Sequence, residues 1–295
     1  MGKCWCDPRW TSSRDEAEPC SVAPQNICRH EPPFDDTCMD YEEGWGRLRV
    51  SSDERYKSAQ NCELDFWRTT KVPQRNHYQL HMLDRFKALP EQLGHVLELG
   101  AGPYTKLRLI LEGGTIRRTV KTATLLDPLA FAYATDALVS SSYKTGTMCL
   151  NQSKGFGGGC IPTTIGSFGA EVSMPMGAYD TVIMVNTIEH CKNSMIVLEN
   201  IWNSLRPGGY LVFGEEFVAK PGATDLCHPL RITLKFYRMW LEESFKGGIK
   251  LLVACAAGLG RTELCRNVPS GSALTPRVLH TLAVQQSVYA IAQKA

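Results

Sequence analysis

The sequence predicts an α/β domain whose largely parallel sheet is covered by helices on both faces. Short apolar runs alternate with stretches of helical periodicity from residue 93 onward, as in chains that build parallel strands joined by helices. A Gly-containing turn separates the first apolar run from the helical stretch that follows it. The 295 residues can bury a substantial core, as one large domain or one domain with an extra segment.

The composition narrows the class of protein. Hydrophobic residues make up 43% of the chain and charged residues 21%, the balance of a soluble globular protein. A net charge of only +2 gives no reason to expect a nucleic-acid partner. Apolar runs such as 181–185 and 249–257 are far shorter than the roughly 20 residues that cross a bilayer, so we expect no transmembrane span.

Residues 1–50 are predicted to form a Cys- and Pro-rich irregular extension. The first residues lack the apolar core of a signal peptide, which favours a cytoplasmic protein. Gly2 with Cys4 and Cys6 leaves lipid anchoring open. Six of the twelve cysteines lie in the first 62 residues. They would form disulfides in a secretory lumen, and free thiols or weak metal ligands in the cytosol; unpaired surface thiols are the favoured interpretation.

Residues 51–92 are predicted to form two helices that cover the main domain. In the first, about 52–68, the expected buried side carries Tyr56, Ala59, Leu64 and Trp67. The second, about 75–89, ends before Pro90. These helices either form a lid or simply pack their tryptophans against the main domain.

The main domain, residues 93–295, is predicted to alternate strands and helices. We expect strands at 95–99, 122–126, 179–185 and 209–213. We expect helices at 105–112, 129–140, 194–204 and 230–245, and a Gly-rich loop at 140–162. The runs 249–257 and 286–293 form a final pair that can supply an antiparallel edge to the same sheet.

The strongest functional signal is VLELGAGPYTK, from Val96 to Lys106. An apolar strand ends in Glu98 and turns through Gly100, Ala101 and Gly102, so the backbone is bare where a ligand must come close. Ligands bind at this end of the strands in parallel sheets. A dinucleotide fingerprint is an alternative, but Thr105 stands at its third glycine. A purely structural turn is another.

Three further segments follow in order. TLLDP ends a second apolar run at Asp127, which either accepts hydrogen bonds from ribose hydroxyls or caps a helix. AYDTVIMVNTIEHC and SLRPGGYLVFGEE each contain a buried strand. With ELGAG, LLDP, YDTVIMVNTIEH and LRPGGYLVF in this order, the chain resembles the class I S-adenosylmethionine-dependent methyltransferases over roughly residues 76–295.

The resemblance implies a Rossmann-like, doubly wound sheet of seven mostly parallel strands, with S-adenosylmethionine as cofactor and no metal. Glu98, Gly100, Ala101 and Gly102 would hold the amino-acid end of the cofactor, and Asp127 the ribose. Near the adenine, Gly169 occupies the usual acidic position, so Glu171 or the backbone around Ala170 would make the contact. Asn186 would complete the cofactor site at the end of the strand 179–185.

Methyl transfer requires the protein to align a nucleophile and exclude water. His190 lies beyond the strand 179–185, and His228 opens a His-Pro-Leu-Arg turn, so both are candidate catalytic residues. Either histidine can instead hold its loop or cap a helix. We expect a small-molecule or carbohydrate-like acceptor; the oligomeric state is left open.

Two other functions fit parts of the sequence. One is a methyltransferase-like domain that binds cofactor or a partner without turnover. The other is a cysteine-dependent phosphatase, because ACAAGLGRTE carries Cys255 and Arg261 at C-x5-R spacing. Ala254 replaces the usual histidine, and only some 30 residues follow Arg261, so a chance match is preferred.

Overall fold

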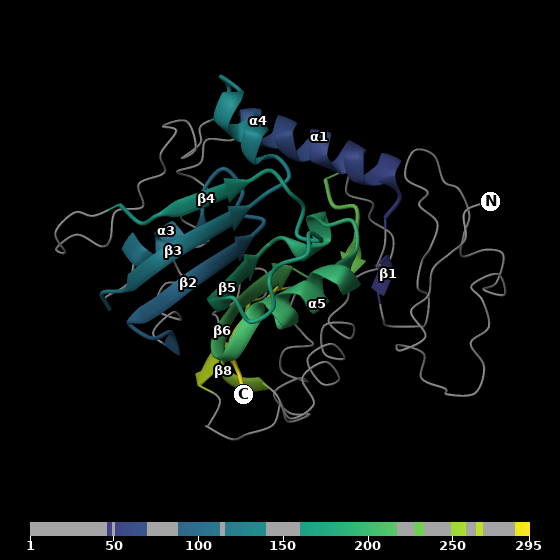
Figure 1. The fold of residues 1–295 in the computed structure, drawn as a ribbon. Helices are drawn as coiled ribbons and strands as arrows, with labels where there is room; N and C mark the ends of the chain where they lie inside the picture. The colour runs from purple at the N-terminus through teal and green to yellow at the C-terminus, as the bar shows by residue number, and fades with distance from the viewer. Residues whose placement is uncertain are drawn as a thin grey trace, which may run out of the picture.

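The computed structural model describes residues 46–48, 51–69, 88–112, 116–139, 160–216, 227–232, 249–257, 264–267 and 287–295. They form an α/β fold around one eight-stranded sheet (Figure 1). The strand order is β4-β3-β2-β5-β6-β10-β8-β9. A separate two-stranded sheet pairs β1 (Gly46–Leu48) with β7 (Arg231–Ile232).

Most of the large sheet is parallel. Its parallel neighbours are β4 (Thr163–Gly166), β3 (Thr119–Leu126), β2 (Gln92–Leu99), β5 (Tyr179–Val185) and β6 (Leu205–Glu216). β10 (Ser287–Lys294) runs antiparallel between β6 and β8 (Ile249–Ala257), and β9 (Leu264–Asn267) pairs antiparallel with β8. β5 is buried along nearly its whole length and β2 over its last four residues, as a sheet covered on both faces requires.

The connections create a ligand crevice in the middle of the sheet. From β2 the chain moves outward through α3 (Lys106–Glu112) to β3, and from β5 it moves in the other direction through α5 (Ser194–Ser204) to β6. Right-handed crossovers in opposite directions place α3 and α5 on opposite faces of the sheet (Figure 1). The carboxyl ends of β2 and β5 therefore flank a topological switch point, where α/β folds bind ligands.

The predicted Rossmann-like α/β fold is confirmed, with two corrections. The sheet has eight strands instead of seven, because β9 adds an edge beside β8. The segment 230–245 does not begin as a helix, because Arg231 and Ile232 pair with β1; its residues 233–245 lie outside the described part. The short strand β4 directly follows the predicted loop 140–162 and was not predicted, because its sequence TTIG has little apolar pattern.

The four strands predicted in the first part of the domain are present, as is the antiparallel relation of β8 and β10. Helix α4 (Ala130–Thr135) is shorter than the predicted 129–140, because the backbone becomes extended at Asp136. The predicted helix at 75–89 and most of the extension 1–50 lie outside the described residues.

Helix α1 (Asp53–Thr69) crosses above the sheet in Figure 1. It buries Ala59 and Trp67, two of the four residues predicted for its inner side. Arg68 forms ion pairs with Asp65 and with Asp136, and a disulfide joins Cys62 to Cys227. Cys62 is thus not the surface thiol that the sequence favoured, because the fold brings its partner across 165 residues.

The core lies between the sheet and the helices. Its centre is formed by apolar side chains of the central strands and α3, among them Leu93, Val96, Leu107, Ile110 and Ile183. Among the described residues, none of the helices is both long and apolar enough to cross a membrane.

Candidate functional site

A pocket opens at the carboxyl ends of β2, β3 and β5, beneath α1. The turn after β2 contributes one wall, the segments after β3 and β5 contribute two more, and α1 covers the top. Its lining residues are Tyr56, Gln60, Glu63, Trp67, Gly100, Gly102, Pro103, Tyr104, Lys106, Asp127, Pro128, Leu129, Tyr133, Ala170, Val185, Asn186, Thr187, His190 and Cys191. Gly100, Gly102, Asp127 and Asn186, four of the predicted cofactor residues, therefore line the same cavity as residues of α1.

The two glycines of the β2 turn have different roles. Both adopt the left-handed backbone conformation, with φ of +62° at Gly100 and +61° at Gly102. A Cβ on Gly100 would lie 2.1 Å from the Thr187 side chain, whereas a Cβ on Gly102 would meet no atom within 4 Å. Gly100 thus permits close protein packing, and Gly102 leaves the space above the turn open for a ligand.

Glu98 holds the turn and does not line the pocket. Its buried carboxylate accepts hydrogen bonds from Thr105 Oγ1 at 2.5 Å and from the backbone N–H groups of Lys106 and Leu107. Burial raises the pKa of Glu98, and these hydrogen bonds oppose that rise. Thr105, which breaks the dinucleotide fingerprint, is here a partner of Glu98. Ala101 is likewise fully buried and is not a lining residue.

Asp127 stands at the end of β3 and faces the glycine turn. Oδ2 accepts a hydrogen bond from Gly102 N, and Oδ1 accepts one from Leu129 N, both at 2.8 Å. Burial raises the pKa of Asp127 to about 6, while the two backbone hydrogen bonds work against the rise. Because a carboxylate has about four lone-pair sites, further hydroxyl donors can still bind its oxygens.

Asn186 and Thr187 follow β5 at the opposite side of the crevice. Asn186 lines the pocket with φ of 54°, a conformation that costs free energy in a non-glycine residue. The buried Glu215 fixes this segment, because its Oε1 accepts hydrogen bonds from Thr187 N and Ile188 N. Glu215 lies in β6, which pairs with β5, and its contact with the segment after β5 was not predicted from the sequence.

Glu171 lies outside the pocket lining and holds the segment before α5. Its Oε1 accepts hydrogen bonds from the backbone N–H groups of Lys192 and Asn193, just before α5, and it is not a lining residue. Ala170 does line the pocket. Of the two groups that the sequence left open as adenine contacts, Ala170 borders the pocket and Glu171 does not.

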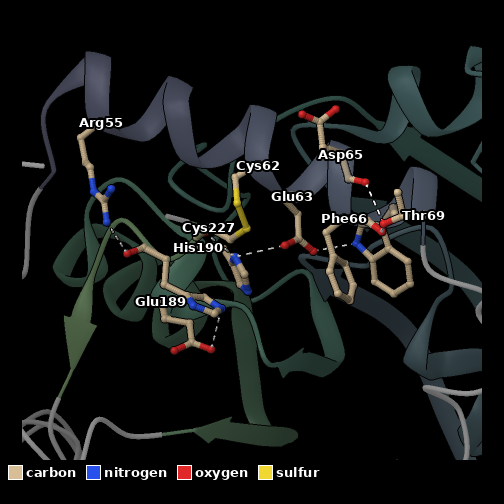
Figure 2. The surroundings of a disulfide bond; sticks show 11 residues. Arg55, Cys62, Glu63, Asp65, Phe66, Thr69, Glu189, His190 and Cys227 are labelled. Atoms are coloured by element: carbon tan, nitrogen blue, oxygen red, sulfur yellow. Dashed lines mark hydrogen bonds and ion pairs between the residues drawn. A yellow bond between two sulfur atoms is a disulfide. The ribbon is translucent and has the colours of Figure 1, made fainter. Parts of the chain in front are cut away.

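Of the two candidate catalytic histidines, His190 lines the pocket and His228 does not. Their ring centroids are nevertheless 4.4 Å apart, and His228 Nε2 lies 3.4 Å from Glu189 Oε1. Figure 2 shows Glu63 of α1 pointing toward His190, with 3.8 Å between Oε2 and Nδ1. The Cys62–Cys227 disulfide lies beside this group.

The polar residues on the inner face of α1, Gln60 and Glu63, are the part of the site that the sequence analysis missed. Tyr56, Gln60, Glu63 and Trp67 recur at intervals of three or four residues, so one helical face covers the pocket. Glu63 accepts a hydrogen bond from Trp67 Nε1 at 2.6 Å, and burial raises the pKa of Tyr56 far above its usual value. The periodicity was visible in the sequence, but Gln60 and Glu63 are polar and gave no core signal.

The phosphatase-like segment does not form a phosphate-binding loop at Cys255. Cys255 lies inside β8 and is paired with Tyr289 of β10 and with Cys265 of β9. Backbone amides in a strand paired on both sides serve the sheet and cannot encircle a phosphate. Arg261 lies outside the described residues.

Comparisons with known proteins identify the family. The family model of the methyltransferase domain matches residues 73–252, more than half of the chain. No curated protein sequence matches at a significant level.

Solved structures of the same fold include three methyltransferases with TM-scores of 0.50 or 0.51. Phosphoethanolamine N-methyltransferase 1 of Haemonchus contortus, in complex with phosphoethanolamine and S-adenosylhomocysteine, is 14% identical with a TM-score of 0.51; the match covers 83% of this chain but only 50% of that one. A Leishmania major S-adenosylmethionine-dependent methyltransferase is 14% identical with a TM-score of 0.51, covering 82% and 87%.

The third is 1,6-didemethyltoxoflavin-N1-methyltransferase of Burkholderia thailandensis, with its substrate and S-adenosylhomocysteine bound. It is 12% identical with a TM-score of 0.50, and the match covers 85% of this chain and 94% of that one. At these identities the likeness shows the fold, while the family match shows the class of enzyme. The chain belongs to the methyltransferase domain family and is an S-adenosylmethionine-dependent methyltransferase.

Proposed function

We propose that this enzyme methylates a polar small molecule or carbohydrate-like acceptor in the pocket beneath α1. The main support for this proposal is that Gly102, Asp127, the inner face of α1 and His190 all line the same cavity. S-adenosylmethionine supplies an electrophilic methyl group when bound; the chain must orient the acceptor and keep water out.

In this proposal the cofactor lies along the carboxyl ends of β2, β3 and β5. Gly100 and Gly102 border its amino-acid portion, Asp127 accepts the ribose hydroxyls, and Asn186 borders the same cavity. The residues fit such a group, since a Cβ at Gly102 would fill open space. Glu98, Ala101 and Glu171 act as positioning residues through the loops that they hold.

The acceptor end is assigned to α1 and the two histidines. Gln60, Glu63 and His190 supply hydrogen-bonding groups there, and Trp67 with Tyr104 supplies aromatic surface, 6.5 Å apart between ring centroids. This mixture suits a small polar ligand better than a flat macromolecular surface. His190 would border the acceptor, and His228 would lie behind it, with 4.4 Å between the ring centroids.

The disulfides favour an oxidising compartment over the cytoplasmic location expected from the sequence. Cys62 and Cys227 are bonded to each other, and Cys160 is also disulfide-bonded. Such bonds persist mainly in secretory and other oxidising compartments. Thiol alkylation of the protein in intact cells, followed by mass spectrometry, should leave Cys62 unlabelled; a labelled Cys62 would return the protein to a reducing compartment.

The function is tested with the full-length chain in two steps. Calorimetry with S-adenosylhomocysteine should show binding, and incubation with methyl-labelled S-adenosylmethionine should transfer label to a member of a panel of amines, hydroxyl compounds and sugars. His190→Ala should reduce transfer about 100-fold or more while leaving cofactor binding in place. Cofactor binding with no transfer to any acceptor class would favour the non-catalytic alternative.

A further inference from the structure

Two histidines and a glutamate meet beside the pocket. Glu189 and His190 belong to the turn after β5, and His228 follows the disulfide-bonded Cys227. One nitrogen or oxygen from each of the three side chains lies within 4.8 Å of the others. We propose that Glu189, His190 and His228 bind a divalent transition-metal ion of the zinc class at the acceptor end of the pocket.

The donor set suits such an ion. Two imidazole nitrogens and one carboxylate oxygen are characteristic of sites that keep a coordination position open for water or substrate. Ligands about 2.0 to 2.2 Å from a tetrahedral ion lie about 3.3 to 3.6 Å from one another. His228 Nε2 and Glu189 Oε1 already have this spacing at 3.4 Å, and a nitrogen of His190 lies within 4.8 Å of both residues' ligand atoms.

The hydrogen bonding orients His190 as a ligand. Its Nδ1 lies 3.1 Å from the carbonyl oxygen of Cys227, which can only accept, so Nδ1 carries the proton. In this tautomer Nε2 carries the lone pair and would be the coordinating atom. Metal-bound histidines commonly have such a carbonyl or carboxylate behind them. The Glu63 carboxylate, 3.8 Å from the same Nδ1, adds negative charge that favours a bound cation.

The two segments that supply the ligands are held together independently of any ion. The Cys62–Cys227 disulfide anchors the residue before His228, and Arg55 Nη2 donates to the His228 carbonyl oxygen at 3.1 Å. Leu230 N donates to the Glu189 carbonyl oxygen at 3.0 Å. A preformed arrangement loses little conformational entropy when it binds. Figure 2 shows Glu189, His190 and the disulfide in this shared neighbourhood.

The position gives the ion access to the acceptor. His190 belongs both to the three-residue cluster and to the pocket wall. An ion held by the cluster would therefore border the pocket on the side covered by α1, where its open position can orient an oxygen or nitrogen of the acceptor. This role rests on the proposed function, whereas binding of the metal itself does not.

The test is calorimetric titration of zinc into the oxidised, metal-stripped full-length protein without cofactor. We expect one zinc bound by the wild-type chain, with affinity at that site reduced about 100-fold or more in His228→Ala and Glu189→Gln. His95→Gln is the matched control, because His95 bonds Thr122 on the neighbouring strand, outside the cluster, and should leave zinc affinity unchanged.

Cobalt titration distinguishes this site from cysteine ligation elsewhere in the chain. Cobalt held by histidine and carboxylate should give weak visible bands without an intense thiolate charge-transfer band, and His228→Ala should abolish them. Binding of S-adenosylhomocysteine by each variant checks that it is folded. The absence of zinc binding by the wild-type protein, a thiolate band, or unchanged affinity in a folded His228→Ala would each overturn the proposal and leave a metal-free His228–Glu189 pair.

Discussion

Gly102 and Gly100 show how single glycines can serve a binding site in different ways. Both require a left-handed backbone, but only Gly102 has open space where a side chain would project. A substitution at Gly100 would collide with Thr187 and disturb the fold itself. Gly102 is therefore the cleaner position at which to test whether the cofactor occupies the turn.

Gly102→Val should lower the affinity for S-adenosylhomocysteine at least about tenfold, because the branched side chain would enter the ligand space. Gly208→Val is the matched control: Gly208 has φ of +75°, equally open surroundings and no contact with the pocket. Both variants carry a similar backbone strain of about 1 to 2 kcal/mol. Calorimetry on the two proteins separates the effect of backbone strain from that of a blocked ligand space. Equal affinities would contradict the proposed cofactor position.

Asp127 should make cofactor binding dependent on pH. Its pKa of about 6 lies above that of an ordinary aspartate because the group is buried. As pH falls through 6, the carboxylate gains a proton and loses acceptor capacity for ribose hydroxyls, so affinity should decline toward pH 5. Calorimetric titrations from pH 5 to 7 measure the slope. Asp127→Asn should bind more weakly with a flatter profile; an equally steep profile would assign the dependence to another group.

At the scale of elements, α1 joins the site through both side chains and a covalent bond. Its inner face lines the pocket, its carboxyl-terminal Arg68 reaches Asp136 after α4, and Cys62 is bonded to Cys227. The Arg68 pair is partly exposed and contributes little, since exposed ion pairs are screened by water. The disulfide is expected to dominate the attachment of this helix.

Removing the Cys62–Cys227 disulfide should lower the free energy of unfolding by about 2 to 4 kcal/mol, because the bond closes a long loop in the unfolded chain. Urea unfolding of Cys62→Ser, Cys227→Ser and the double variant provides the measurement. The three variants should be nearly equal in stability, since each breaks the same bond. A double variant that loses the sum of both single effects would indicate that the two cysteines act separately.

At the scale of the whole molecule, the end of the described chain completes the sheet. β10 hydrogen-bonds to β6 on one side and to β8 on the other. Lys294 Nζ also donates to the carbonyl oxygens of Trp202 and Leu205. The last strand thus connects the edge strands to the central part of the fold.

Deletion of residues 287–295 should prevent stable folding, because it leaves β6 and β8 with unpaired edges and removes buried Ile291. Circular dichroism and gel filtration should show an unfolded or aggregated protein. Lys294→Met is the comparison: it removes two hydrogen bonds but keeps the strand, so it should remain folded with slightly lower thermal stability. A folded deletion variant would contradict this prediction, because it would show that the fold is stable without β10 between β6 and β8.

The local pattern of apolar and polar residues was sufficient to predict the central strands and helices of the domain. Continuous apolar runs placed β2, β3 and β5, and α5 was predicted with its observed bounds, because burial on a sheet and helical periodicity are encoded over neighbouring residues. The positions of Gly100, Gly102, Asp127 and Asn186 around one pocket followed from strand order, since parallel strands bring their carboxyl ends together.

The tertiary structure alone decided the partners of these residues. Glu98 and Glu171 accept hydrogen bonds from backbone N–H groups that the sequence did not identify as partners, and Cys255 lies within a paired strand. The polar face of α1 became a pocket wall, and Cys62 met Cys227 across 165 residues. Periodicity reports which side of an element is buried, whereas contacts between distant segments depend on how the whole chain packs.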